Sequence, residues 1–208
     1  MQVVHYPFLN SGESGPLAPI VLAPYRGDWH AGADVYKRWL ATWFHPLPMP
    51  AWAQDIHAWQ QLQINSSKDD LRTKYGDLPA RVADDPKHGI TVLQLVGWNR
   101  GGQDRDNPTC DTDPRLGRAA QLKDAIARME NMGIHVVLFA KYAWADTSTD
   151  WYKTELYKHM ATDPYGDIYT WAGYRYQTPE QFAGINPRNL ATACSNDAAW
   201  RKILAGEF

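Results

Sequence analysis

The chain has 208 residues, of which 44% are hydrophobic and 21% charged, a composition typical of a globular protein rather than a disordered one. Its 21 basic and 23 acidic residues leave a net charge of −2, which gives no electrostatic case for nucleic acid or an anionic membrane as a partner. No apolar run approaches the ~20 residues that cross a bilayer, and the N-terminus lacks the pattern of a signal peptide. The cellular compartment stays open, with the cytoplasm only as the default, and so does the oligomeric state.

The N-terminal quarter is predicted to hold the end of a β domain and a linking helix. Residues 2–7 and 19–24 have the pattern of short strands, separated by a turn-rich stretch. Asp28 is a suitable cap for a helix over 29–44, and a proline-rich segment follows it. Because two strands do not form a stable domain alone, residues 1–50 are interpreted as the tail of an N-terminal β domain plus a linker.

From residue 51 onward, predicted strands alternate with predicted helices. The strands are expected at residues 57–65, 89–99 and 134–142, and the helices at residues 71–84 and 116–132. Pro79 lies in the middle of the first helix or in the first turn of a second piece, and Pro86 should stop it. Gly133 is expected to end the second helix.

The last third of the chain is predicted to be less regular. Thr149 or Ser148 should cap a helix that runs to residue 160, and residues 165–177 have the pattern of a small hairpin. Asn196 is expected to cap a final helix over 197–204.

This order of elements is typical of a parallel α/β fold. The inward positions Gln63, Gln94 and Lys141 are polar, which the rim of a barrel interior tolerates better than a sheet covered by helices on both faces. A complete (β/α)₈ barrel takes ~250 residues, so three strands cannot close one. The sequence therefore predicts the truncated N-terminal part of a TIM barrel in residues 51–208, with a small doubly wound sheet as the alternative.

A polar, glycine-containing loop follows the second predicted strand. It reads WNRGGQDRDNPTCDTD over residues 98–113, and its glycines permit close approach to a ligand. The residues expected to grip sugar hydroxyls are Asn99, Arg100, Asp104 and Asp106. The spacing of its aspartates also suggests calcium, but Pro108 occupies the fifth ligand position of an EF-hand loop. Aspartates that only cap turns are the third interpretation.

The end of the third predicted strand carries a second candidate group. Lys141 lies on the inward face, where a lysine needs a partner or a wet cavity. It is either a donor to substrate hydroxyls or a cation beside a catalytic carboxylate, or else it forms a structural ion pair with an aspartate of a neighbouring strand. Asp146 either binds substrate or caps the helix that follows it.

Aromatic residues are enriched, with 10 Trp and 11 Tyr against 5 Phe. Indole and phenol rings offer flat faces for the C–H groups of sugars, although such residues also fill cores. Trp98 and Trp144 stand at strand ends and are the candidates for stacking.

Other kinds of site are not indicated. The sequence has no HExxH, CxxC pair, P-loop, GxGxxG or GxSxG pattern, so neither a metal nor a cofactor is expected. Cys110 and Cys194 lack metal-ligand spacing and are expected to be free thiols.

Several segments resemble a family of (β/α)₈-barrel proteins that is similar to the α-galactosidase-type glycoside hydrolases. They are QLVGWNRGGQDRDNP, DPRLG, GIHVVLFAKYAWAD, DPYGD and INPRN, and YRGDWHAGADVYKRW resembles the junction between an N-terminal β-sandwich and the barrel. The resemblance covers most of residues 52–208, and Pro86 departs from it. It implies a barrel that acts on carbohydrate, with the nucleophilic carboxylate on the fourth strand and the acid/base on a later one.

The leading hypothesis is therefore the N-terminal barrel part of a retaining glycosidase that supplies sugar-binding loops. Such enzymes use two carboxylates ~5 Å apart, and both are expected beyond Phe208. A non-catalytic carbohydrate-binding barrel and a truncated remnant without function are the alternatives.

Overall fold

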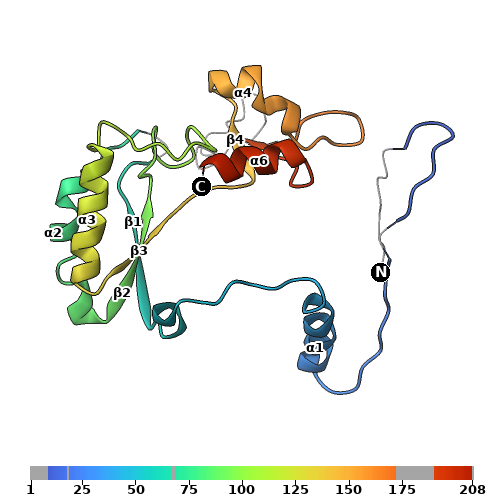
Figure 1. Cartoon of the computed structure of the whole chain (residues 1–208), viewed down its shortest axis with the longest axis horizontal. Helices are drawn as coiled ribbons and strands as arrows, with labels where there is room; N and C mark the ends of the chain where they lie inside the picture. The colour runs from blue at the N-terminus through green and yellow to red at the C-terminus, as the bar shows by residue number, and fades with distance from the viewer. Residues whose placement is uncertain (1–8, 18, 67–68, 172–189, 208) are drawn as a thin grey trace, which may run out of the picture. The chain divides into compact units, whose positions relative to one another are not determined.

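The computed structural model describes residues 9–17, 19–66, 69–171 and 190–207. The chain divides into two compact units, Met1–Asp55 and Ile56–Phe208, which are treated separately below (Figure 1). No helix within the described residues is long and apolar enough to cross a membrane.

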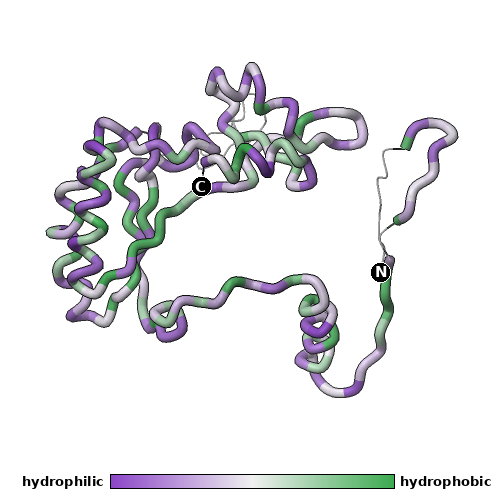
Figure 2. The backbone as a smooth tube through the Cα atoms, in the orientation of Figure 1, coloured by the Kyte–Doolittle hydropathy of each residue, from purple (hydrophilic) through white to green (hydrophobic). Residues whose placement is uncertain are grey.

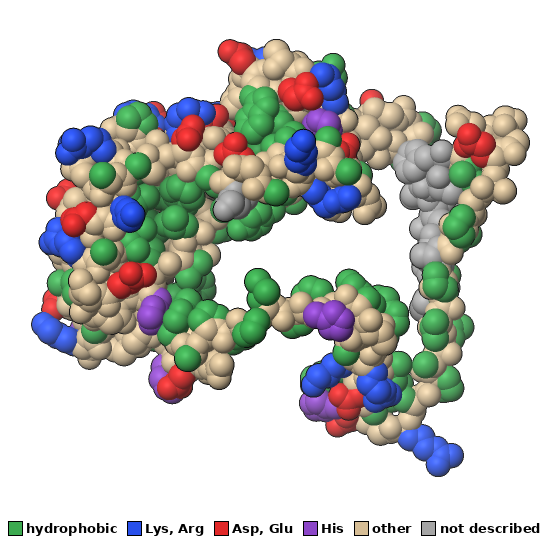
Figure 3. Space-filling model, viewed as in Figure 1, with side chains coloured by type: hydrophobic (Ala, Val, Ile, Leu, Met, Phe, Trp, Pro, Cys, Tyr) green, Lys and Arg blue, Asp and Glu red, His purple; other side chains and the backbone are tan. Residues whose placement is uncertain are grey.

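The first unit contains one α-helix, α1 (Trp29–Leu40), among its described residues. As predicted, Asp28 caps it: its Oδ1 accepts a hydrogen bond from the backbone N–H of His30 at 3.0 Å. The helix ends at Leu40 rather than at residue 44, and none of its residues is buried. Figure 3 accordingly shows hydrophobic and charged side chains side by side on its surface.

The other described residues of the first unit are irregular apart from a short 3₁₀ turn, η1 (Ala51–Gln54). The prediction of a strand at residues 19–24 is wrong, because this segment pairs with no other described strand and so lacks the ladder that stabilises extended backbone. The other predicted strand, at residues 2–7, lies outside the described residues.

The second unit is built on a parallel sheet of β1 (Ala58–Gln63), β2 (Ile90–Val96) and β3 (His135–Leu138), in the order β1-β2-β3. Each lies within a predicted strand, so the parallel α/β prediction is confirmed. In Figure 2 the hydrophobic colour is strong along β2 and β3. The register sets Gln61 beside Gln94 and Gln94 beside Val137 on one face.

Residues 71–84 do not form one continuous helix, and of the two positions predicted for Pro79 the first turn of a second piece is the one found. Three short pieces take its place: η2 (Tyr75–Asp77), α2 (Leu78–Arg81) and η3 (Asp85–His88). Both prolines of the segment lie in the first turn of a piece, at Pro79 and Pro86, because a proline deeper in a helix would lose a hydrogen bond and clash with the preceding turn.

Helix α3 (Ala119–Asn131) packs on the same side of the sheet as α2 (Figure 1). Gly133 follows it with φ +83°, the left-handed conformation that ends helices. The core between sheet and helices is apolar and includes Ile64, Leu78, Leu93, Leu95, Leu122, Met129 and Ile134. The opposite face of the sheet carries the row of Gln61, Gln94 and Val137.

A second, antiparallel sheet was not predicted. It consists of β4 (Trp144–Asp146), β6 (Leu190–Thr192) and β5 (Thr170–Trp171), with β6 in the middle. Residues 144–146 follow the third predicted strand, and three residues are too few to show the alternation typical of a strand. The predicted hairpin at 165–177 lies outside the described residues beyond Trp171.

Among the described residues, three short helical elements accompany this sheet: α4 (Asp150–Thr154), η4 (Leu156–His159) and α6 (Ala198–Glu207). Thr149 caps α4 as predicted, since its Oγ1 accepts from the N–H of Tyr152 at 3.0 Å. Asp197 rather than Asn196 caps α6, because its Oδ1 accepts from the N–H of Trp200 at 2.9 Å. Trp200 itself is buried beneath the sheet.

Candidate functional site

The loops after β1, β2 and β3 meet at the carboxyl edge of the parallel sheet. Asn65 follows β1, and Gly97 follows β2 with φ +75°. The two backbones touch here: a Cβ at Gly97 would lie 2.0 Å from the carbonyl oxygen of Asn65. Glycine therefore allows the loop of β2 to begin directly against the loop of β1.

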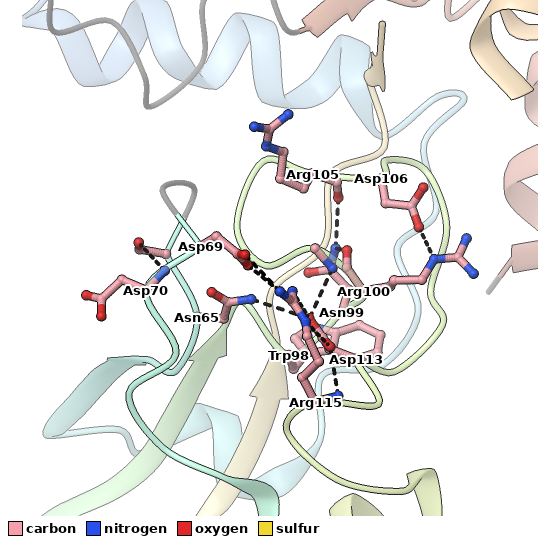
Figure 4. Close-up of polar contacts among 12 residues, drawn as sticks. Asn65, Asp69, Asp70, Trp98, Asn99, Arg100, Arg105, Asp106, Asp113 and Arg115 are labelled. Carbon is pink, nitrogen blue, oxygen red and sulfur yellow. Dashed lines mark hydrogen bonds and ion pairs between the residues drawn. The ribbon is translucent and has the colours of Figure 1, made fainter. Parts of the chain in front are cut away.

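A buried carboxylate, Asp113, ties these two loops together (Figure 4). Arg115 holds it with two parallel bonds, Nε to Oδ1 at 2.9 Å and Nη2 to Oδ2 at 2.6 Å, and reaches Asp69 with Nη1 at 2.7 Å. The backbone N–H of Gly101 donates to Asp113 at 3.2 Å, and the side-chain amide of Asn65 at 3.4 Å. Bidentate pairs of this kind fix geometry as well as charge.

The pKa of Asp113 is lowered. Burial alone would raise it, but the side-chain and backbone hydrogen bonds from Arg115, the charge of Arg115 and the N–H of Gly101 outweigh burial. Tyr75 completes the arrangement, since its hydroxyl donates to the carbonyl of Trp98 at 2.6 Å and accepts from the N–H of Asp113 at 2.9 Å. Burial raises the pKa of Tyr75 to about 12, so it stays a neutral donor.

The outer part of the loop after β2 is held by ion pairs. Arg100 pairs with Asp106 through Nε and with Asp111 through Nη1, the latter at 3.2 Å. The hydrogen bond that Arg100 donates to Asp106, together with the charge of Asp106, raises the pKa of Arg100 against the effect of burial. Asn99 is buried and donates to the carbonyl of Arg105 at 3.0 Å (Figure 4). Asn99 and Asp106 therefore shape the loop, while the Arg100 side chain stays exposed.

Lys141 forms an ion pair with Asp104, and both side chains are largely buried, at 16% and 4% exposure. Of the alternatives considered for Lys141, an ion pair with an aspartate of the neighbouring βα unit is the arrangement found. The ammonium also lies over two indole rings, 4.5 Å from the centroid of Trp144 and 5.5 Å from that of Trp171. The two rings meet edge to face, with centroids 4.5 Å apart.

Both carboxylate oxygens of Asp146 are used within the protein. Oδ2 accepts from the backbone N–H of Asp106 at 2.8 Å, and Oδ1 accepts from the N–H and hydroxyl of Ser148 at 2.9 and 2.6 Å. Asp146 therefore joins the loop after β2 to the turn before α4. It caps this turn rather than presenting a free oxygen to solvent.

Trp98 belongs to the core. Its ring is buried within the apolar cluster of the parallel sheet, and its Nε1 donates to the carbonyl of Phe139 at 2.8 Å. The structure therefore places this indole where it cannot offer a face to a ligand, and we assign it to packing.

The sequence analysis missed four residues of this edge: Asn65, Arg115, Tyr75 and Trp171. Arg115 stands two residues after Asp113 in a turn-rich stretch. This spacing was the sequence signal that could have indicated a pair between the two side chains. Trp171 had no local signal, because β6 brings it to Trp144 across the antiparallel sheet. Within the described ranges, no cluster of three or more His, Cys, Asp or Glu residues could hold a metal ion.

Comparison with known proteins places the fold but not a sequence family. No protein-family model matches the sequence, and no curated protein matches it. The α-N-acetylgalactosaminidase NagBb of Bifidobacterium bifidum in complex with GalNAc is 14% identical, with a TM-score of 0.53 over 72% of this chain and 25% of that one. Its Gal-NHAc-DNJ complex gives 15% identity and a TM-score of 0.53 over 72% and 24%.

The trehalose-6-phosphate hydrolase TreA of Bacillus licheniformis is 16% identical, with a TM-score of 0.49 over 76% of this chain and 33% of that one. The chain spans about a quarter of the length of the α-N-acetylgalactosaminidase chains it matches. The likeness to the two α-N-acetylgalactosaminidase chains shows that this chain shares its fold with a part of them.

Proposed function

We propose that this chain is the N-terminal barrel part of a glycosidase-like protein and that the carboxyl edge of its parallel sheet contributes to a sugar-binding site. The fold likeness to an α-N-acetylgalactosaminidase supports the barrel and the class of protein. Loops at the carboxyl ends of parallel strands are where barrel proteins place their ligand-binding groups.

The observation that carries the proposal is the cluster of Lys141, Asp104 and Trp144 at this edge. A sugar ring has an apolar C–H face and a rim of hydroxyl groups. An indole ring suits the first, and ammonium, guanidinium and carboxylate groups suit the second. We assign direct contact to Trp144 and to the exposed guanidinium of Arg100.

The other groups of the proposed site act by holding it in shape. Asn99 and Asp106 fold the loop after β2, and Asp146 attaches this loop to the turn before α4. Substituting them is expected to weaken binding through loss of loop geometry rather than through a lost contact with the sugar.

The 208-residue chain is expected to bind neutral sugars at this edge. Titration of ¹⁵N-labelled protein with N-acetylgalactosamine, galactose and glucose should shift the indole N–H signal of Trp144. Trp144→Ala should weaken the affinity about fivefold or more, because a stacking ring is lost. The matched control is Trp59→Ala, which removes an exposed indole near the amino end of β1. Equal affinities of the two variants would refute this assignment.

The chain alone is expected to release no nitrophenol from 4-nitrophenyl α- or β-glycosides. The rim carboxylates among the described residues are bonded within the protein: Asp104 to Lys141, Asp106 to Arg100, and Asp146 to backbone N–H groups. The lowered pKa of Asp113 is the reverse of what a general acid needs. A heat-unfolded sample is the blank, and turnover above it would show that this account of the carboxylates is wrong.

A further inference from the structure

The antiparallel sheet places a second indole beside the proposed site. Trp171 lies on β5, which pairs with β6, and β6 pairs with β4, where Trp144 lies. Trp171 is the more accessible ring, since 38% of the residue is exposed whereas Trp144 is partly buried. The two rings are inclined at 69° and so form a corner rather than a parallel stack.

The ammonium of Lys141 sits against this corner. It lies 4.5 Å from the centroid of Trp144 and 5.5 Å from that of Trp171, within the range in which a cation is attracted to an aromatic face. Because the ammonium is largely buried, it has lost most of its water and gains more from these contacts than an exposed lysine would.

The carboxylate of Asp104 neutralises the positive charge of the largely buried Lys141 ammonium. Its carboxylate is almost fully buried, and it comes from a residue with φ +62°, a backbone conformation that aspartate adopts more readily than most side chains. Removing either partner would leave the other charge poorly solvated, which is costly in a buried pair. The pair is therefore a fixed part of the loop rather than a flexible surface contact.

We propose that Trp171 is a further sugar-contacting residue, that it and Trp144 form an aromatic platform, and that Lys141 and Asp104 are positioning residues which hold the two rings in place. This rests on the proposed sugar site and assigns Lys141 a role through the indoles rather than as a donor to hydroxyls. The ligand class is a neutral saccharide with an open C–H face.

The test is to titrate the full chain with N-acetylgalactosamine and with galactose. Isothermal calorimetry measures the affinity, and the indole N–H signals show which rings are affected. Trp171→Ala should weaken the affinity about fivefold or more, since it removes the more exposed ring. The control Trp151→Ala removes an indole of nearly equal exposure, 36%, from α4 and should leave affinity unchanged.

Lysine variants separate positioning from general stability. Lys141→Met keeps the length of the side chain and removes the charge, so it should weaken binding about threefold or more and shift the signals of both indoles. Lys141→Arg keeps a cation over the rings and should restore affinity to within about twofold. Asp104→Asn should weaken sugar binding and shift the indole signals as Lys141→Met does. It tests the same ion pair if the methionine variant does not fold.

Three results would overturn the inference. If Trp171→Ala binds like wild type while Trp144→Ala is weakened, the platform is wrong and the proposed function stands. If Lys141→Arg is as weak as Lys141→Met, the cation does not position the rings. If the wild-type chain binds none of these sugars, the proposed function fails and this inference fails with it.

Discussion

Replacing Gly97 by alanine is expected to destabilise the second unit by more than about 4 kcal/mol, enough to prevent its cooperative folding. A methyl group there would lie 2.0 Å from the carbonyl oxygen and 2.9 Å from the carbonyl carbon of Asn65. Both are backbone atoms at the end of β1, so neither can turn away as a side chain would. Relief requires that β1 and β2 separate at the edge where their loops meet.

Gly133→Ala is the matched control for Gly97→Ala. Gly133 also has a positive φ, +83°, but a Cβ there would meet nothing within 4 Å. Its substitution should cost only the left-handed backbone strain, about 1–2 kcal/mol. Urea unfolding followed by circular dichroism measures both variants, and similar losses for the two would show that the contact with Asn65 is not what requires glycine at position 97.

Asp113→Asn is expected to lower the free energy of unfolding at pH 7 by about 2–3 kcal/mol. The amide of asparagine cannot accept both hydrogen bonds from Arg115 as well as the one from the N–H of Gly101. Asp69 then remains as the ion-pair partner of Arg115. Asp111→Asn is the control from the same loop, because Asp111 is exposed and pairs with Arg100 at 3.2 Å. That variant should lose no more than about 0.5 kcal/mol.

The loss caused by Asp113→Asn should depend on pH in one direction. The folded-state pKa of Asp113 is lowered from about 4, so its carboxylate stabilises the fold above that pH. This contribution disappears as the pH falls through the unfolded pKa towards the folded one. The unfolding free energies of wild type and Asp113→Asn should therefore converge in acid, and a gap that is constant from pH 7 to pH 3 would contradict the ion-pair account.

The parallel sheet and α3 were predictable because their patterns are long and repeat regularly. The alternation of Leu62 and Ile64 with Gln61 and Gln63 sets one face of β1 towards the helices, and the apolar spacing of α3 does the same from the other side. The segment over residues 71–84 is divided, as one of the two alternatives predicted, because Pro79 can stand only in the first turn of a helix and so begins a second piece. Pro86 likewise stands in the first turn of η3, which follows this segment.

Within the candidate site, the sequence indicated the right loops but not the roles of their residues. The loop after β2 contains Asp104, Asp106 and Asp113, which look equivalent in sequence. In the fold, Lys141, Arg100 and Arg115 each hold one of them. The partner of Asp104 depends on where β3 brings Lys141, and no local pattern encodes that. Arg100 and Arg115, in contrast, lie only six and two residues from the aspartates that they hold.

The sequence by itself determined the parallel α/β class, the edge at which the loops gather and the cap of α1, because each depends on residues a few positions apart. Only the tertiary structure decided that Trp98 is buried, that Asp146 fastens the loop after β2 and that Trp171 joins Trp144. These contacts link segments that are 27 to 41 residues apart in the chain. Their energy comes from burial and from the pairing of charges out of water, which exist only after the strands have packed.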